Sequence, residues 1–272
     1  MSDFATRRRW GPTPKYPKVV DYIPPDFNFI CIAGPCSVES EDQIKRLAEF
    51  VAKQGATHLR GGVFRAGTYP GENFGLVGDD LIEAFAHAGR SNGLKTIIEV
   101  LDYRPEAMHR IAPFADCYQV GARQMQNYTL LRELGATEKQ IFLKRNPGAT
   151  IDEWLGAAEH LLTGGPCQPV LIERGSGTNS GHVRWDLSIS MIPAVGAISK
   201  IPVVCDPSHV TCRRYLVEPL ALAGVAAGAA GLLIEVHPIP EESFSDADQA
   251  ITPTDFKNLM RKVRRIRKSL SN

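Results

Sequence analysis

The sequence predicts a single α/β domain, a closed (β/α)8 TIM barrel preceded by a short N-terminal extension. Three observations carry this prediction. Short apolar runs alternate with amphipathic stretches from end to end, eight of each kind can be counted, and the 272 residues fit one barrel of about 250 residues. An open sheet usually carries a GxGxxG turn after its first strand, whereas this chain has Gly34-Pro35-Cys36-Ser37 there. A closed barrel is therefore favoured.

The strands are expected where β-branched or apolar residues cluster between turn residues. In chain order these runs are 29–33, 57–60, 96–100, 117–120, 141–144, 170–173, 203–205 and 231–236.

The helices are expected in the amphipathic stretches that follow the strands, at 41–54, 79–91, 104–111, 127–134, 151–162, 187–198, 214–227 and 253–268. Thr150 with Glu153, and Thr252 with Pro253, are typical of helix starts. Gly55, Gly93, Gly135 and Gly228 follow helical stretches and are expected to end them. Short connections of this kind predict right-handed parallel crossovers.

The predicted domain boundaries are 1–28 for the extension and 29–272 for the barrel. The extension holds five prolines and is expected to cover the bottom of the barrel or to contact another subunit. The balance of 31 basic and 30 acidic residues gives no reason to expect a nucleic-acid or membrane partner. The basic runs 7–9 and 261–268 are better explained as solvated termini or helix faces.

The cysteines and the apolar runs indicate a cytoplasmic protein. The six cysteines include no CxxC pair, which favours reduced thiols over a disulfide framework. No apolar run reaches the roughly 18 residues that a membrane span needs. The segment after Arg9 is too polar and proline-rich for a signal peptide.

Charged residues follow most of the predicted strands, and a barrel builds its chemistry at these carboxyl ends. Several basic side chains should therefore meet at one rim. They would repel one another unless an anion joins them, and phosphate or carboxylate suits an arginine fork. The alternative is that each arginine pairs with a neighbouring carboxylate, as Arg174 could with Glu173. The basic residues at strand ends are Arg60, Arg65, Arg123, Lys144, Arg145 and Arg174.

A second group combines one thiol, one imidazole and two carboxylates, in Cys36, His209, Glu235 and Asp246. Such mixed donors suit a divalent transition ion. Because the four residues are far apart in sequence, a buried cysteine and a hydrogen-bonded histidine remain the alternative for each taken singly.

Several strand-end motifs together resemble the metal-dependent 3-deoxy-7-phosphoheptulonate (DAHP) synthases, in the short form related to the 3-deoxy-8-phosphooctulonate synthases. The resemblance covers most of the chain, and the motifs fall in the family's order. They are Gly34-Pro35-Cys36-Ser37-Val38-Glu39-Ser40, Leu59-Arg60-Gly61-Gly62, Gly121-Ala122-Arg123-Gln124-Met125-Gln126-Asn127, Leu143-Lys144-Arg145, Ile172-Glu173-Arg174-Gly175, Asp206-Pro207-Ser208-His209 and Ile234-Glu235-Val236-His237-Pro238.

The resemblance implies an aldol-type condensation of phosphoenolpyruvate with a sugar aldehyde, in which phosphate leaves. For the heptulonate synthases the aldehyde is erythrose 4-phosphate and the pathway is the shikimate pathway to the aromatic amino acids. By the same resemblance, Arg123, Lys144 and Arg174 hold the phosphate of phosphoenolpyruvate, and Arg60 helps hold that substrate.

The resemblance also implies that Cys36, His209, Glu235 and Asp246 bind the metal, which can be Mn, Fe, Co or Zn. Asp206 and His237 are expected to orient the ligands. Cys36, His209 and Arg65 are expected to take part in catalysis. A homodimer or homotetramer is the implied assembly.

One departure from the family concerns the acceptor. Relatives carry Lys-Pro-Arg-Thr where this chain has Arg65-Ala66-Gly67-Thr68, so the arginine that grips the acceptor phosphate is absent. We therefore hold two enzymatic hypotheses: a heptulonate synthase that grips its acceptor with Arg184 or Thr68, and a relative that condenses phosphoenolpyruvate with another aldehyde in specialised metabolism. A non-catalytic, anion-binding regulatory barrel is the alternative of another class.

The departure predicts the effect of Gly67→Arg. Restoring the guanidinium should raise kcat/KM for erythrose 4-phosphate by about one to two decades, because a charge-assisted hydrogen bond contributes roughly 1.5–3 kcal/mol. Steady-state kinetics with this aldehyde checks the prediction. No gain would mean that the acceptor is held in another way.

Overall fold

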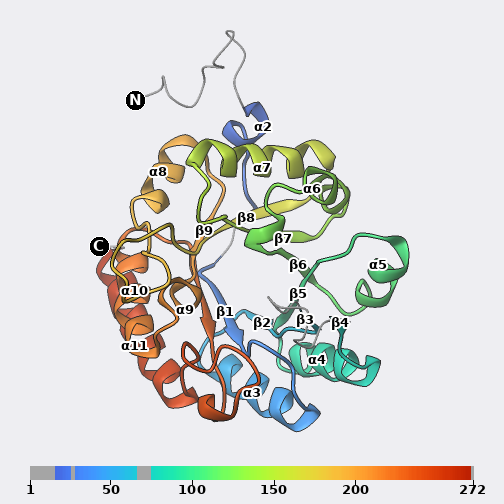
Figure 1. Ribbon diagram of the computed structural model, residues 1–272, viewed down its shortest axis with the longest axis vertical. Coiled ribbons are helices and arrows are strands. Elements are labelled where there is room, and N and C mark those ends of the chain that lie inside the picture. Colours follow the sequence, from blue (N-terminus) through green and yellow to red (C-terminus); the bar gives the residue numbers. More distant parts are fainter. Residues whose placement is uncertain (1–15, 26–27, 66–74, 271–272) are drawn as a thin grey trace.

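The computed structural model describes residues 16–25, 28–65 and 75–270, and in it eight parallel strands close into a barrel, as predicted (Figure 1). Around the barrel the strands follow chain order, each hydrogen-bonded to the next, and β1 closes the ring against β10. They are β1 (Ile30–Gly34), β2 (His58–Arg60), β5 (Lys95–Glu99), β6 (Cys117–Val120), β7 (Gln140–Lys144), β8 (Gln168–Glu173), β9 (Val203–Cys205) and β10 (Gly231–Glu235).

Helices surround the barrel, with one in each connection and one after the last strand (Figure 1). Their ends agree with the sequence prediction to within a few residues, and α8 departs most because residues 187–190 form turns instead. They are α3 (Glu41–Lys53), α4 (Asp79–Ser91), α5 (Pro105–Ile111), α6 (Tyr128–Gly135), α7 (Ile151–Gly164), α8 (Met191–Ile198), α10 (Arg214–Ala226) and α11 (Pro253–Leu270).

Short elements that the sequence did not predict lie between these units. The antiparallel hairpin of β3 (Phe64–Arg65) and β4 (Gly75–Leu76) follows β2. The others are α2 (Pro17–Val20), η1 (Ala122–Gln124), α9 (Pro207–Thr211) and η2 (Pro240–Glu242). They are too short to leave a periodic pattern in the sequence.

Most of the expected helix ends are confirmed. Thr150 and Glu153 form a reciprocal capping box at the start of α7. Gly55, Gly93 and Gly228 have positive φ angles, as helix-ending glycines should. Gly135 is different: it is the last residue of α6, and a Cβ there would lie 2.1 Å from the carbonyl oxygen of Leu161. That glycine is needed for the close packing of α6 on α7.

The core has two layers, because parallel strands are buried on both faces. Alternate strand residues fill the barrel, among them Ile32, Phe142, Ile172 and Leu233. The larger layer lies between the strands and the helices and is centred on side chains such as Leu59 and Trp154. The barrel interior is therefore closed by side chains, and the polar groups at the carboxyl ends of the strands have a rigid base.

The described part of the N-terminal extension packs on α7. Tyr16 donates a hydrogen bond to Asp152 at 3.0 Å, and the Val19 N–H donates to Glu159 at 2.9 Å. Burial raises the pKa of Tyr22 to about 12, and Cys167, just before β8, contributes to the same rise. Tyr22 and Cys167 therefore lie close together. The described part of the extension thus lies near the amino-terminal end of β8, and the role of residues 1–28 stays a prediction.

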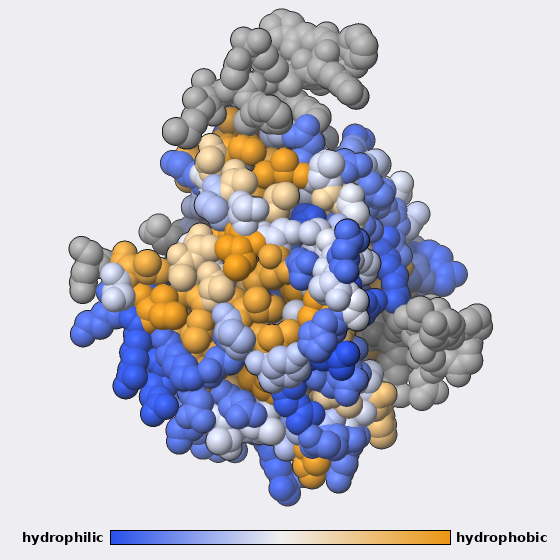
Figure 2. All heavy atoms as spheres, turned by 60° about the vertical axis from the view of Figure 1, so that its left-hand side comes forward, coloured by the Kyte–Doolittle hydropathy of each residue, from blue (hydrophilic) through white to orange (hydrophobic). Residues whose placement is uncertain are grey.

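One side of the surface is markedly apolar. Figure 2 shows a broad hydrophobic patch on the side of the molecule where α8 and α10 lie. The sequence of α8, MIPAVGAI, contains no polar side chain, and Tyr215 of α10 is 63% exposed. Patches of this extent on a folded protein commonly mark contact surfaces. Among the described residues, no helix is both long and apolar enough to cross a membrane.

Burial of His58 predicts a pH-dependent stability. Its side chain is 6% exposed, and burial lowers its pKa from 6.5 to about 4. The unfolded chain binds this proton more readily, so His58 should reduce the free energy of unfolding as the pH falls from about 6.5 towards 4, by up to about 3 kcal/mol. Urea unfolding between pH 7 and 4.5 checks this.

The matched variants are His58→Gln and His87→Gln, the latter at an exposed position of α4. His58→Gln should reduce the pH dependence of the free energy of unfolding, and His87→Gln should leave that dependence unchanged. Parallel curves for wild type and His58→Gln would contradict the assignment.

Candidate active site

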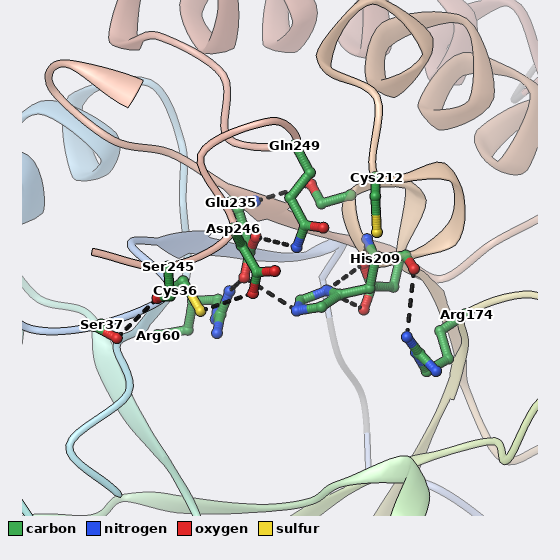
Figure 3. Close-up of polar contacts among 12 residues, drawn as sticks. Cys36, Ser37, Arg60, Arg174, His209, Cys212, Glu235, Ser245, Asp246 and Gln249 are labelled. Atoms are coloured by element: carbon green, nitrogen blue, oxygen red, sulfur yellow. Dashed lines mark hydrogen bonds and ion pairs between the residues drawn. The ribbon is translucent and has the colours of Figure 1, made fainter. Parts of the chain in front are cut away.

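Four of the predicted functional side chains converge at the carboxyl ends of β1, β9 and β10 (Figure 3). Cys36 follows β1, His209 lies in α9 directly after β9, Glu235 ends β10, and Asp246 lies in the loop after η2. Since β1 pairs with β10 and β10 with β9, the barrel closure places these segments side by side. Distant sequence positions therefore meet because the barrel closes.

The donor atoms are close enough to share one ion. One ligand atom each from Cys36, Glu235 and Asp246 lies within 4.8 Å of the others, and the Cys36 thiol donates to Asp246 Oδ2 at 3.0 Å. His209 Nε2 lies 3.0 Å from Glu235 Oε1. Three of the four predicted ligands thus form one group and His209 adjoins it through Glu235, and a thiol, an imidazole and carboxylates are donors that suit a divalent transition ion. Their role as ligands stays a prediction.

A shell of hydrogen bonds fixes the imidazole of His209. Asp206, fully buried, lies 2.8 Å from His209 Nδ1, so Nε2 points towards Glu235. Burial by itself acts to raise the pKa of Asp206, but His209 and Lys144 hold it well below its usual value. Burial likewise acts to lower the pKa of His209, and the charges of Asp206 and Glu235 outweigh it and raise the pKa.

The carboxylate of Glu235 is held on both oxygens. Arg60 and Gln249 donate to it, and its backbone N–H donates to Ser208 Oγ at 3.0 Å. Despite full burial, the charges of His209 and Arg60 keep the pKa of Glu235 far below its usual value. Glu235 is therefore ionised and rigid.

Asp246 occupies a strained backbone conformation. Its φ of 56° is left-handed, which is uncommon for a residue other than glycine. The loop that carries it is tied to the segment after β1, because Ser245 Oγ lies 3.0 Å from Ser37 Oγ and the Phe244 N–H donates to Glu39 at 2.9 Å. Strain of this kind concentrates at functional sites.

A group of basic side chains lies beside these donors. Lys144 Nζ lies 3.3 Å from Asp206 Oδ2, and Arg174 donates to the backbone oxygen of His209 at 3.3 Å. The pKa of Arg174 is lowered by burial and by the charges of Arg184 and Arg123, so these cations are close together. No carboxylate of the described residues lies within ion-pair distance of Arg174.

Arg145 does not belong to this group, which corrects the predicted ring of cations. Arg145 is 1% exposed and forms a two-pronged ion pair with Glu173, with Nη2 donating to Oε1 at 2.8 Å. Side chains alternate along a strand. Lys144 and Arg174 face the mouth of the barrel, and Arg145 and Glu173 face the helices behind them.

The buried pair ties down the loop that follows β8. Glu173 accepts from the Gly175 N–H at 2.7 Å, and Arg145 donates to Ser188 Oγ at 3.1 Å. Gly175 has a φ of 95°, and a Cβ there would lie 2.8 Å from the Cβ of Trp185. Both ends of the 175–188 loop, which carries Arg184, are therefore anchored to the strands of Lys144 and Arg174.

Several sequence predictions have other outcomes. Arg65 lies in β3, its side chain lies outside the described residues, and Thr68 lies outside them altogether. His237 was expected to orient the metal ligands. Its ring instead contacts Gln43 at 2.9 Å, Glu39 at 3.3 Å and the backbone oxygen of Ile239 at 2.7 Å. It therefore joins the β1 and β10 loops.

Sequence reasoning missed two supporting residues. Gln249 donates to the carboxylate of Glu235, and Gln119 donates to Glu99 Oε2 at 2.7 Å at the ends of β6 and β5. No local pattern marks Gln249, because it reaches Glu235 across a loop. Gln119 lies within a predicted strand whose other residues are apolar or aromatic, and its polarity there was the available signal.

The arrangement separates two chemical tasks. A thiol, an imidazole and two carboxylates can hold a cation that polarises a carbonyl oxygen, and the arginine and lysine side chains beside them can bind an anion such as phosphate. Asp206 contacts both sets. The site can therefore hold an anionic substrate next to a Lewis-acidic centre.

Comparison with known proteins agrees with this arrangement. Residues 22–271 match the model of the DAHP synthetase I family. Phospho-2-dehydro-3-deoxyheptonate aldolase of Thermotoga maritima is 37% identical over 242 residues, which cover 89% of this chain and 71% of that protein. A 2-dehydro-3-deoxyphosphooctonate aldolase of Bradyrhizobium is 26% identical and covers 88% of each chain.

Solved structures give the same result. A truncated 3-deoxy-D-arabino-heptulosonate 7-phosphate synthase of Thermotoga maritima superimposes with a TM-score of 0.82 at 35% identity, covering 89% of this chain and 88% of that one. Another structure of the Thermotoga maritima protein gives a TM-score of 0.84 at 36% identity, covering 89% and 70%. On the match to residues 22–271 and on this likeness in sequence and fold, the chain belongs to the DAHP synthetase I family.

Proposed function

We propose that the protein condenses phosphoenolpyruvate with erythrose 4-phosphate and water to give 3-deoxy-7-phosphoheptulonate and phosphate. One observation carries the proposal: Asp206 contacts both Lys144, among the cations, and His209, among the mixed donors. In this reaction C3 of phosphoenolpyruvate bonds to the aldehyde carbon, water adds at C2, and the bond to phosphate breaks. An anion site beside a carbonyl-polarising site meets those needs.

On the donor side, we assign the phosphate of phosphoenolpyruvate to Arg123, Lys144 and Arg174. Their proximity and the lack of a carboxylate partner for Arg174 support this assignment. Arg60 lies deeper, bonded to Glu235, where it can meet the carboxylate end of the same substrate. Fixed cations stabilise the charge on the leaving phosphate without reorganising.

We assign Cys36, His209, Glu235 and Asp246 to a divalent metal, Mn, Fe, Co or Zn. The donor set supports this assignment. Burial, and then the charges of Glu235 and Asp246, raise the pKa of the Cys36 thiol against the lowering effect of Arg60, and a bound cation would favour the thiolate. When bound, such an ion supplies Lewis acidity to the aldehyde oxygen. Asp206 keeps the His209 ring in the orientation and tautomer that ligation requires.

The second half of the site binds the aldehyde substrate. We propose Arg184 as the cation that takes over from the missing arginine of the family, with Thr68 as a further acceptor contact and Arg65 as a catalytic side chain. The sequence Arg65-Ala66-Gly67-Thr68 also favours a second candidate, condensation of phosphoenolpyruvate with a different aldehyde, since the usual phosphate contact is absent.

We further propose that the protein is a homodimer or homotetramer that associates through the apolar face of α8 and α10 (Figure 2). Exposed side chains such as Tyr215 support this proposal, because water-exposed apolar patches are costly. The six unpaired cysteines support a reducing compartment, the cytosol.

Phosphate release tests the proposed reaction. The protein with a divalent metal and phosphoenolpyruvate should release phosphate with erythrose 4-phosphate, at a rate at least tenfold above that with arabinose 5-phosphate or unphosphorylated erythrose. Turnover only with another aldehyde would support the second candidate. No release with any aldehyde would overturn both and favour a non-catalytic barrel.

Replacing the thiol tests the metal assignment. Cys36→Ala should weaken metal binding by at least about 10- to 100-fold, since even outer-shell changes have effects of that size, while the melting temperature of the metal-free protein changes little. Metal titration by calorimetry measures the affinity. Cys167→Ala, at a buried position before β8, is the control and should lower stability while leaving metal affinity intact. Equal metal affinity in wild type and Cys36→Ala would contradict the assignment.

A further inference from the structure

A cavity of about 280 Å³ opens at the mouth of the barrel, beside the site described above. Its walls are residues 181–184, residues 211–213 and Asp248. We call it the outer pocket. Its volume is near the lower end of those that small-molecule sites occupy.

The outer pocket is built from the same segments as the active site. Residues 211–213 follow the predicted ligand His209, and Asp248 lies two residues after the predicted ligand Asp246. Residues 182–185 are the returning limb of the loop that starts at Arg174, and they pair with the chain after His209: the Trp185 N–H donates to the Val210 oxygen at 2.9 Å. The outer pocket therefore lies beside the donor atoms.

The charge of the outer pocket suits an anion. Arg184 and Arg213 line it, and neither forms an ion pair with any carboxylate of the described residues. Arg184 Nη1 lies 4.0 Å from the Cys212 thiol, whose pKa burial raises above its usual value, so the thiol provides no counter-charge at neutral pH. The lining of the outer pocket thus holds two arginines and one carboxylate, that of Asp248, and Arg213 Nε donates to the backbone oxygen of His182 at 3.4 Å.

Backbone strain points to the same place. Among the described residues other than glycine, positive φ angles occur at Asp246 and Cys212, and Cys212 has a φ of 54°. Figure 3 shows the Cys212 side chain pointing towards the segment of His209. The left-handed turn at Cys212 lies between His209 and Arg213 in the chain. It therefore fixes the position of Arg213 in the pocket wall relative to His209. Such strain is typical of ligand-binding positions.

We propose that the outer pocket binds the phosphate, or an equivalent anionic end group, of the aldehyde substrate through Arg184 and Arg213. This inference rests on the proposed condensation and names the site that replaces the missing arginine contact. Phosphoenolpyruvate does not need the pocket, because Arg123, Lys144, Arg174 and Arg60 already supply cations for both of its anionic groups. The acceptor phosphate is then the anion left without a partner.

Two variants test the proposal by steady-state kinetics. Arg213→Gln and Arg184→Gln should each raise KM for erythrose 4-phosphate about 10- to 100-fold, the effect of one charge-assisted hydrogen bond. Turnover of unphosphorylated erythrose and KM for phosphoenolpyruvate should change less than about twofold in Arg213→Gln. Arg104→Gln is the matched control, since Arg104 is an exposed cation after β5 that has its own partner, Asp102.

The outcomes separate this inference from the proposed function. Normal KM for erythrose 4-phosphate in both variants, with active wild type, overturns the pocket assignment alone. An equal loss of turnover with erythrose and with erythrose 4-phosphate also overturns it, because the two arginines would then not bind the phosphate group. A rise only in KM for phosphoenolpyruvate would assign the arginines to the donor and overturn it as well.

Calorimetry measures binding of the aldehyde to the outer pocket independently of turnover. Erythrose 4-phosphate titrated into the protein should bind at least tenfold more weakly to Arg213→Gln than to wild type or Arg104→Gln, and erythrose should show no such difference. Unchanged binding in Arg213→Gln, or no binding to wild type, would overturn the proposal even if no aldehyde is turned over.

Discussion

The buried carboxylate of Asp206 connects the two halves of the site. It lies 2.8 Å from His209 Nδ1 and 3.3 Å from Lys144 Nζ, and it is fully shielded from water. An isolated buried charge would be unstable, so Asp206 depends on its contacts with His209 and Lys144. The distance between the thiol-containing donor group and the basic group is thereby fixed by one side chain at the end of β9.

The barrel supplies the conditions that this arrangement needs. Alternation along β7 and β8 directs Lys144 and Arg174 to the mouth and places Arg145 and Glu173 behind them. The rear pair is fully buried, satisfies its hydrogen bonds and anchors both ends of the 175–188 loop. Breaking such a pair leaves an unpaired buried charge, so it acts as a rigid support for Lys144 and Arg174. Function at the mouth is therefore coupled to packing beneath the helices.

The donor and acceptor halves of the site differ in how they are built. The cations assigned to phosphoenolpyruvate lie at strand ends or within a few residues after them, close to the hydrogen-bonded barrel. Arg184 and Arg213, assigned to the acceptor, come from loops, and both side chains are exposed. Loops can change without disturbing the barrel, and this allows one scaffold to combine a constant donor with different aldehydes.

Much of this protein could be predicted from the sequence. The eight strands, the capping of α7 and the polar residues at strand ends follow from local composition, because burial and hydrogen-bonding preferences act over a few neighbouring residues. The family resemblance also came from such local motifs. The direction in which each side chain points could not be predicted in this way. Arg145 and Lys144 are adjacent and both cationic, and only the register of β7 against β8 decides that Arg145 faces a buried glutamate and Lys144 faces the mouth. Likewise, Gln249 reaches Glu235, His237 joins two loops and Cys212 borders the outer pocket because barrel closure brings β10 beside β1 and β9. Contacts between segments far apart in the chain depend on that closure, and no local pattern in the sequence records them.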